Sequence, residues 1–339
     1  MKGLIIKKRP KKILIIKPSS LGDVIHSLPF LKSLNETFLD TEIHWVIARG
    51  LEGLLENHPM IKRIWIINKD DWKNLKTLER TIKEFRYLFS ELKKESFDIV
   101  VDLQGLFRSA LIAYTTGSPI RIGLKNSREG SSLFYTHKVE SERDIHAVDK
   151  YLMIASALGC EIKNISFPMP LIKEKDYIKK IKEEIGDYVV LIPSARWKTK
   201  IWGAEKFGRL SKMLNMRSLI IGSNSDIEIA KEIEVFSSGK AISFAGKTDL
   251  KDVITLIRGS RFVISNDTGP MHIAAALNKQ VVAIFGPTSP ERTGPYGKNH
   301  LVIRSSLSCS PCFKKRCSDI RCMDSIKVED VYNKIKEIP

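Results

Sequence analysis

The sequence predicts an α/β protein made of two doubly wound domains with parallel sheets, facing each other across a cleft. Three observations lead to this fold class. The chain has 339 residues, more than one core usually holds. Short apolar runs alternate with amphipathic ones, as in β-α-β units. The alternation stops once, in a stretch with two prolines at residues 160–170, and then restarts. We therefore expect domains at residues 1–170 and 171–339.

The elements of the first domain follow from this alternation. Short apolar runs predict strands at residues 12–17, 42–48 and 98–102. The stretches between and after them predict helices at residues 23–34, 74–95, 108–114 and 145–158.

The same alternation in the second half predicts the elements of the second domain. Strands are expected at residues 188–192, 218–222, 262–265 and 281–285, and helices at residues 204–213, 226–236, 250–259 and 271–277. Ligands of doubly wound sheets bind beyond the carboxyl ends of the strands. The residues that follow each strand are therefore the candidates for chemistry.

Composition limits the class of partner. Lys plus Arg is 56 and Asp plus Glu is 39, which leaves a net charge of +17. This excess favours an anionic partner, such as nucleic acid, a phospholipid surface or a phosphorylated substrate. The basic opening has no long apolar region, because Lys17 interrupts the first apolar run, and nothing later resembles a membrane span. We expect a cytosolic protein whose basic surface suits an anionic membrane.

Four of the five cysteines lie within fourteen residues of one another. They are Cys309, Cys312, Cys317 and Cys322. In a reduced compartment this spacing is typical of a tetrahedral thiolate site for zinc or iron, with redox disulfides as the alternative. Since no histidine or open ligand position accompanies them, we expect a structural site.

In the first domain, the loop at residues 18–26 follows a strand. It contains only Gly22 of the glycines that a dinucleotide loop needs, so NAD is not expected there. Asp23 lies in the first helical turn, where a carboxylate stays ionised and can accept a proton. It can equally just complement the helix dipole. His26 is a second partner of this site or an ordinary half-buried imidazole.

A second strand of the first domain ends near polar and cationic side chains. Gln104 and Arg108 follow the strand at residues 98–102, and Arg128 comes later. Together they suit an anionic acceptor, although each taken alone is typical of a surface residue.

In the second domain, the strand at residues 262–265 leads into Asn266-Asp267-Thr268-Gly269-Pro270. Asp267 or Thr268 is a good helix N-cap, and Gly269 lets a ligand approach the backbone. The free N–H groups of such a helix start bind phosphate or diphosphate, and His272 lies beside them. The alternative is an ordinary capped helix.

Two further strand ends supply polar groups. Ser194 and the cations Arg196, Lys198 and Lys200 follow the strand at residues 188–192. Cations aimed at a departing diphosphate can replace a divalent metal, although a solvated basic loop would read the same. Asp226 follows another strand, where an acid can bind ribose hydroxyls.

Taken together, these blocks resemble the lipopolysaccharide heptosyltransferases of glycosyltransferase family nine. The blocks are KPSSLGDVIHSLP (17–29), DLQGL (102–106), PSARWKTKIW (193–202), FAGKTDL (244–250), SNDTGPMHIAAAL (265–277), FGPTSP (285–290) and the cysteine cluster. The cysteine cluster is more similar to the second heptosyltransferase than to the first.

The resemblance implies a fold and an activity. The fold is GT-B, with two Rossmann-like domains, the first binding the acceptor and the second the donor. The activity is metal-independent, inverting transfer from ADP-L-glycero-β-D-manno-heptose to the inner core of lipopolysaccharide, carried by Kdo and lipid A. The expected place is the cytoplasmic face of the inner membrane.

The resemblance also implies roles for single residues. Asp23 matches the general base, and Arg128 matches an acceptor-binding arginine. For the diphosphate and the sugar, Lys200 matches the diphosphate lysine, Thr268 and Gly269 match the phosphate-binding turn, and Asp267 and His272 match the heptose contacts. For the rest of the donor, Asp226 matches the ribose contact, Ser194 a donor hydroxyl, and Gly246, Lys247 and Thr248 the adenine contacts. Ala195 stands where the family has a second threonine, so that contact is lost.

Two other functions compete with this one. A related enzyme would use another sugar donor or another acceptor, such as O-antigen or a protein. A basic zinc-containing nucleic-acid-binding protein is the more distant alternative, and salt-dependent DNA affinity without nucleotide-sugar binding would favour it.

Overall fold

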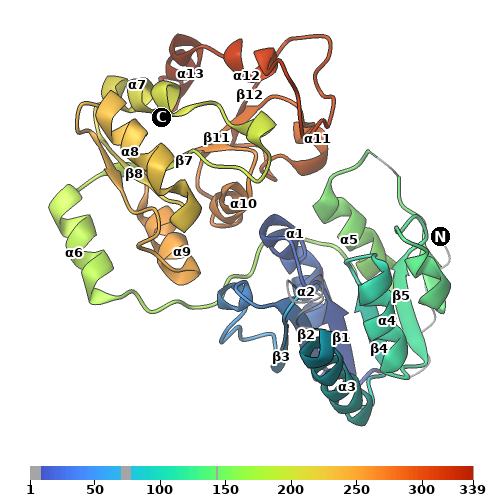
Figure 1. Ribbon diagram of the computed structural model, residues 1–339. Coiled ribbons are helices and arrows are strands. Elements are labelled where there is room, and N and C mark those ends of the chain that lie inside the picture. The colour runs from blue at the N-terminus through green and yellow to red at the C-terminus, as the bar shows by residue number, and fades with distance from the viewer. Residues whose placement is uncertain (1–8, 70–77, 143, 339) are drawn as a thin grey trace. The chain divides into compact units, whose positions relative to one another are not determined.

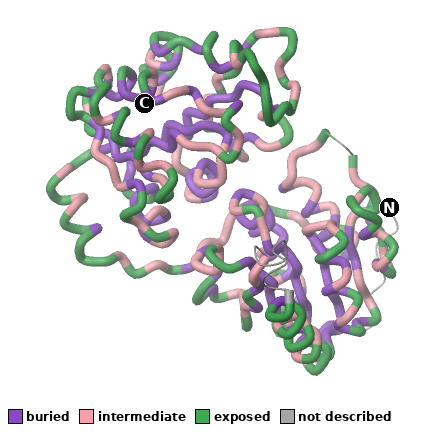
Figure 2. Tube along the Cα trace, in the orientation of Figure 1, coloured by how far each residue is buried: buried purple, intermediate pink, exposed green. Residues whose placement is uncertain are grey.

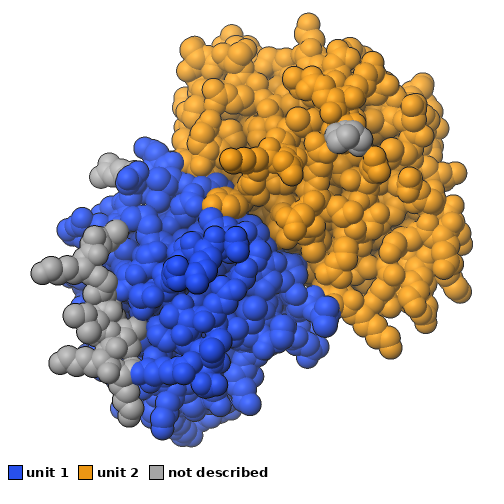
Figure 3. All heavy atoms as spheres, turned by 180° about the vertical axis from the view of Figure 1, so that it is seen from behind, with its two compact units in different colours: residues 1–171 blue, residues 172–339 orange. Residues whose placement is uncertain are grey.

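The computed structural model describes residues 9–69, 78–142 and 144–338. The chain divides into two compact units, residues 1–171 and 172–339, coloured separately in Figure 3. Their boundary lies one residue from the one expected from the proline-containing stretch. Within the described part of the chain, no helix combines the length and the apolar character needed to cross a bilayer.

Unit 1 contains a six-stranded parallel sheet in the order β3-β2-β1-β4-β5-β6 (Figure 1). Its strands are β1 (Lys12–Ile16), β2 (Glu42–Ala48), β3 (Arg63–Ile67), β4 (Ile99–Asp102), β5 (Ile120–Leu124) and β6 (His137–Val139). Its helices are α1 (Leu21–His26), α2 (Leu28–Thr37), α3 (Leu78–Lys94), α4 (Phe107–Thr115) and α5 (Ala147–Ala157), with short 3-10 turns η1 (Glu52–Leu54) and η4 (Ser131–Phe134). Helices α1 and α2 pack with α5, and α3 packs with α4.

Unit 2 repeats this plan in the order β12-β11-β10-β7-β8-β9. Its strands are β7 (Tyr188–Ile192), β8 (Arg217–Ile220), β9 (Ala241–Ser243), β10 (Val263–Asn266), β11 (Val281–Phe285) and β12 (Leu301–Arg304). Its helices are α6 (Asp176–Ile185), α7 (Ala204–Met213), α8 (Ile227–Phe236), α9 (Leu250–Gly259), α10 (Gly269–Ala276), α11 (Pro290–Thr293), α12 (Arg321–Asp324) and α13 (Val328–Ile335), with η5 (Lys198–Lys200) and η6 (Asn224–Asp226). Helix α7 packs with α8 and α13, and α9 packs with α6 and α10.

The central strands of both sheets are buried along their whole length, apart from the first residue of β1 (Figure 2). Residues 13–16 of β1 and 281–285 of β11 are completely buried and mostly β-branched. A parallel sheet covered by helices on both faces requires such continuous apolar strands, because neither face meets water. The predicted doubly wound fold class is therefore confirmed in both units.

In both sheets the strand order reverses at one point, between β1 and β4 in unit 1 and between β7 and β10 in unit 2. The connections leave these neighbouring strands in opposite directions, which opens a crevice beyond their carboxyl ends. The loops that follow these four strands hold most of the candidate residues, so the topology gathers them at the edge of each sheet where ligands bind.

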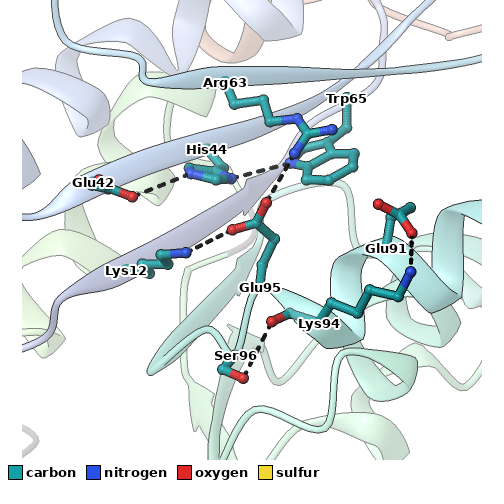
Figure 4. Close-up of polar contacts among 9 residues, drawn as sticks. All are labelled: Lys12, Glu42, His44, Arg63, Trp65, Glu91, Lys94, Glu95 and Ser96. Atoms are coloured by element: carbon teal, nitrogen blue, oxygen red, sulfur yellow. Dashed lines mark hydrogen bonds and ion pairs between the residues drawn. The ribbon is translucent and has the colours of Figure 1, made fainter.

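The opposite edge of the first sheet carries a polar network (Figure 4). Glu95 accepts from Lys12 at 2.7 Å and from Arg63 at 2.9 Å, which joins α3 to the first residues of β1 and β3. Nearby, the Trp65 indole donates to the buried imidazole of His44 at 3.3 Å. These contacts lie at the amino ends of the strands and stabilise the sheet at the edge away from the candidate site.

One expected helix needs correction, one is described only in part, and several elements were missed. The helix expected at residues 23–34 is two helices, α1 and α2, because Pro29 has no N–H to continue the first one. The start of the helix expected at residue 74 lies outside the described residues, and α3 is described from Leu78. Strands β3, β5, β6, β9 and β12 and helices α6, α11, α12 and α13 were not predicted.

Candidate active site

An ion pair spans the point of strand reversal in unit 2. Lys200, in η5 after β7, donates to the Asp267 carboxylate after β10 at 2.6 Å. The two side chains are 16% and 6% exposed, so little water screens the pair. The lysine is thereby held with its ammonium group at the carboxyl edge of the sheet. The structure thus brings together two residues that the sequence placed on different strand ends.

Two residues that the sequence analysis did not single out fix this pair. Thr288, after β11, donates its hydroxyl to the same Asp267 oxygen at 2.6 Å. The ammonium group of Lys200 lies 4.6 Å from the centre of the Trp197 ring, a cation–π contact. Thr288 belongs to the FGPTSP block and Trp197 to the PSARWKTKIW block, so the motifs contained both signals.

The loop at residues 193–202 is held at both ends by one side chain. Asn266, completely buried at the end of β10, donates to the Pro193 carbonyl at 2.5 Å and accepts from the Trp202 N–H at 3.3 Å. The bracketed loop carries the half-buried Ser194 and the exposed Arg196 and Lys198. The two ends of the loop that carries these cations are therefore anchored to the end of β10.

Helix α10 starts beside the ion pair. Its N-cap is Thr268, in extended conformation, and Gly269 and Pro270 form its first turn. The Thr268 side chain makes no capping hydrogen bond within the described residues. The amino end of the helix is therefore not closed by its own cap, and it carries the partial positive charge that attracts phosphate groups. His272 follows in the helix and is buried.

The strand ends of β8 and β9 also meet. Gly246 donates its N–H to the Gly222 carbonyl at 3.0 Å. Gly246 has φ +72°, and a Cβ there would lie 2.5 Å from the Asn224 side chain, so the close approach requires glycine. Lys247 and Thr248 follow in the same turn, and their side chains bond back to the carbonyls of Ser243 and Phe244. The predicted ribose and adenine contacts thus lie on neighbouring turns.

Asp226 caps its own short helix. Its carboxylate accepts from the Ser223 N–H and hydroxyl, both at 2.7 Å. The bonds keep the carboxylate at a fixed place beside the turn, with η6 and α8 running on from it.

In unit 1, Asp23 has the same local arrangement. One of its carboxylate oxygens accepts from the Ser20 N–H at 2.9 Å and from the Ser20 hydroxyl at 2.7 Å. This is a capping box at the start of α1. The dipole-complementing role that the sequence offered is therefore present, and the same bonds fix the Asp23 carboxylate in the first turn of α1. His26 is buried and packs edge-on against His146, at 4.9 Å between ring centres.

A buried lysine lies at the end of β1. Lys17 is 3% exposed, donates to the Leu103 carbonyl at 3.1 Å, and lies 5.2 Å from the Tyr151 ring centre. Burial opposes its charge, yet Tyr151, Asp23 and Asp102 together raise the pKa of the ammonium group above its usual value. Lys17 therefore supplies a positive charge close to Asp23.

The three predicted acceptor residues lie around one turn of unit 1. Gln104 accepts from the Ser19 N–H at 3.3 Å, which links the ends of β4 and β1 across the strand reversal. The Arg128 N–H donates to the Gly105 carbonyl at 3.0 Å, so the later loop lies against the same turn. Arg108, at the second position of α4, and Arg128 both expose their side chains. The structure thus groups these residues around the turn.

The four clustered cysteines lie between β12 and the end of α12, and all five cysteines of the chain are free thiols. Burial raises the pKa of Cys322, and the neighbouring Cys312, Cys309 and Cys317 raise it further. The thiols therefore lie near one another. Among the described residues, however, no three His, Cys, Asp or Glu side chains are grouped closely enough to hold a metal ion. The structural metal site expected from the cysteine spacing therefore stays a prediction.

The arrangement combines two kinds of chemistry. Unit 2 offers a cation held at a helix N-terminus, next to hydroxyl and carboxylate groups, which suits a phosphorylated ligand with a sugar. Unit 1 offers a carboxylate held at a fixed place in the loop and helix that follow β1, which suits the removal of a proton.

Comparison with known proteins gives a family. Residues 85–321 match the family described as glycosyltransferase family 9 (heptosyltransferase). The chain is 29% identical over 322 residues to lipopolysaccharide heptosyltransferase 1 of Pseudomonas aeruginosa, covering 91% of this chain and 87% of that protein. It is 27% identical over 315 residues to lipopolysaccharide heptosyltransferase 2 of Escherichia coli, covering 86% and 88%. The identity to the first type is slightly higher, so these comparisons do not bear out the greater similarity to the second type that the cysteine cluster led us to expect.

A solved structure has the same fold. The Escherichia coli heptosyltransferase WaaC with ADP aligns with a TM-score of 0.79 and 24% identity, covering 97% of this chain and 100% of that one. The expected GT-B architecture, with two six-stranded parallel sheets, is thereby confirmed.

Proposed function

The chain belongs to glycosyltransferase family 9, the heptosyltransferase family, and on that premise we propose that it transfers heptose from an ADP-activated donor to the inner core of lipopolysaccharide. The observation that carries the proposal is the Lys200–Asp267 pair beside the start of α10. It places a cation and a helix N-terminus together where a departing diphosphate would gain negative charge.

Unit 2 is the proposed donor domain. Lys200, Thr268 and Gly269 hold the diphosphate, and Asp267 and His272 bind the heptose hydroxyls. Asp226 takes the ribose, and the turn at residues 246–248 takes the adenine. Ser194 supplies a further hydroxyl. The adjacency of the turns after β8 and β9 supports this assignment, because two turns joined by a backbone hydrogen bond are close enough for one nucleoside to reach both.

Asp23 is the proposed general base in unit 1. It takes the proton from an acceptor hydroxyl while that oxygen forms a bond to the anomeric carbon. The bond from that carbon to the diphosphate oxygen breaks, and its electron pair leaves with ADP. Attack on the face opposite the leaving group inverts the configuration. Stabilising the charge on ADP only as it develops is what lowers the barrier.

The acceptor is proposed to bind unit 1 at the turn that carries Gln104, Arg108 and Arg128. Exposed arginines bind carboxylates and phosphates in a bidentate manner, and the inner core offers both. The net charge of +17 suits this anionic glycan and the anionic membrane surface that carries it. Peripheral association with the cytoplasmic face of the inner membrane belongs to the same proposal.

A transfer assay tests the function. ADP-heptose is incubated with Kdo-bearing lipid A, with and without one prior heptose, in the presence of EDTA, and the products are read by mass spectrometry. Transfer only to the pre-heptosylated acceptor assigns the second type, and transfer to the bare acceptor assigns the first. Loss of transfer with EDTA contradicts metal independence. No transfer to either acceptor, with ADP still bound, refutes the proposed acceptor or sugar.

The base assignment is tested separately. Asp23→Ala is expected to lower kcat by about three orders of magnitude while leaving the Kd for ADP within about two-fold, since a general base acts on the acceptor and not on the nucleotide. Isothermal titration with ADP is the control for folding. Near-normal turnover by Asp23→Ala would remove Asp23 from the mechanism.

A further inference from the structure

One aromatic ring in unit 2 contacts two ammonium groups. Lys200 lies 4.6 Å from the centre of the Trp197 ring, and Lys315 lies 5.4 Å from the same centre. The first lysine follows β7, whereas the second belongs to the cysteine-bearing loop at residues 306–320, which follows β12. The loop therefore delivers a second cation to the neighbourhood of the proposed diphosphate lysine.

The cysteine-bearing loop is anchored where it delivers Lys315. The Lys314 carbonyl accepts from the Thr199 hydroxyl at 2.9 Å, next to Lys200 in η5. The N–H groups of Cys312 and Phe313 both donate to the Pro287 carbonyl, at 3.1 and 2.7 Å. The loop is thus bound to the segments after β7 and after β11, which carry Lys200 and the Thr288 that bonds to Asp267.

The positive charge of the Lys200–Asp267 pair and the start of α10 is smaller than the negative charge of a bound diphosphate. Lys200 is paired with Asp267, so the pair adds no net charge to the site. Lys315 has an exposed side chain, and within the described residues it makes no ion pair and no side-chain hydrogen bond. A nucleoside diphosphate carries at least two negative charges, and the half charge of one helix end does not balance them, so Lys315 can act together with the exposed Arg196 and Lys198 of the loop after β7.

We propose that Lys315 is a second cation for the diphosphate of the nucleotide-sugar donor, supplied by the cysteine-bearing loop. This inference rests on the proposed function and extends its donor site. When the bond between the anomeric carbon and the diphosphate oxygen breaks, its electron pair passes to the diphosphate. Lys315 balances part of that charge beside the Lys200–Asp267 pair, and the proton of the acceptor hydroxyl goes to Asp23. Trp197 holds both ammonium groups toward the same place.

The test compares two neighbouring lysines in the full chain. Lys315→Met removes the charge and keeps an unbranched side chain. Lys314→Met is the matched control, because among the described residues its side chain makes no ion pair or hydrogen bond and its backbone carbonyl accepts from Thr199. ADP and adenosine are titrated into each protein by calorimetry at low and physiological salt. Both side chains are exposed, so both variants are expected to fold, which circular dichroism checks.

We expect Lys315→Met to weaken ADP binding by about 5- to 10-fold at low salt, as one partly screened charge contact would. Adenosine binding should not change, and Lys315→Arg should restore ADP binding. Lys314→Met should change the Kd for ADP by less than about two-fold. Equal losses in both methionine variants, or no loss in either, would overturn the inference. If the unaltered protein binds no ADP, the proposed function itself fails.

Discussion

Asp102 is a completely buried carboxylate with four hydrogen-bond donors. One oxygen accepts from the N–H groups of Gln104 and Gly105 at 2.8 and 3.0 Å. The other accepts from the hydroxyls of Ser109 and Tyr135 at 2.8 and 2.7 Å. Burial raises the pKa of Asp102, and the donors oppose that rise. This one side chain therefore sets the shape of the turn that carries the proposed acceptor residues.

Asp102→Asn is expected to lower the free energy of unfolding by about 2–4 kcal/mol, because the new amide N–H₂ would face two donors in a buried site. Urea unfolding followed by circular dichroism measures the change. Asp40→Asn is the control, since that aspartate is 88% exposed and should change stability by less than about 0.5 kcal/mol. Equal stability of the two variants would show that the buried bonds contribute nothing net.

At the scale of elements, the two units use the same device at two functional places. Ser20 and Asp23 form a capping box at α1, and Ser223 and Asp226 form one at η6. In each case the serine N–H and hydroxyl hold a carboxylate with a proposed role. The cap therefore both starts the helix and orients the functional oxygen.

Ser20→Ala is expected to cost about 1 kcal/mol of stability, as the loss of a helix cap does. It should also lower kcat, because Asp23 loses the hydroxyl that orients it, while the KM for the donor stays unchanged. Steady-state kinetics with the donor and acceptor varied in turn measure both quantities.

Ser223→Ala is the matched variant, with the same chemical change in the other unit. Its effect should fall on the KM for the donor and not on kcat, because Asp226 is proposed to bind ribose. If both variants changed the same kinetic constant, the division of roles between the two units would be wrong.

The elements also show what a sequence can and cannot predict. Strands β2, β7 and β11 and helices α7 and α9 were predicted with their observed bounds, because each is a long apolar or amphipathic run between clear breaks. Strands β6 and β9 have three residues each, and β5 contains Arg121 and Gly123, so neither length nor hydropathy marks them. Their strand form comes from pairing with a neighbour, which is a tertiary effect.

The candidate site shows the same division. Placing Lys200 and Asp267 near each other followed from the rule that parallel strands end at one edge, and the structure pairs them at 2.6 Å. The contacts of Thr288 and Lys315 depend on how two later loops fold back on the sheet. No periodicity or spacing in the sequence predicts how these loops pack against the sheet, so the two contacts are seen only in the structure.

At the scale of the whole molecule, both units bury histidines whose pKa values are lowered. Burial lowers the pKa of His44 and His58 in unit 1 and of His300 in unit 2. The folded state therefore resists protonation, whereas the unfolded chain takes up protons below about pH 6.5. Stability should be fully present above that pH and should fall as the pH drops toward 5.

Two carboxyl groups also make stability depend on pH, but over a different pH range or with the opposite sign. The pKa of Glu95 is lowered by its bond to Lys12, so its contribution is lost only below about pH 4.5. Asp102 acts in the opposite direction, because a carboxyl whose pKa is raised takes up its proton first in the folded state. The histidine contribution is therefore best read as a difference between variants in the range from about pH 7 to 5.

We expect His44→Asn to make the loss of stability between pH 7 and 5 shallower, by up to about 1.4 kcal/mol per pH unit. The wild-type slope includes the proton that unfolding adds to His44, and the variant has no such proton to take up. Urea unfolding at half-unit pH steps measures both slopes. His58→Gln gives an independent second measurement, since its imidazole is bonded to the Pro168 carbonyl in a different part of unit 1. If wild type and both variants lost stability with the same slope, protonation of buried histidines would not govern the acid sensitivity of this fold.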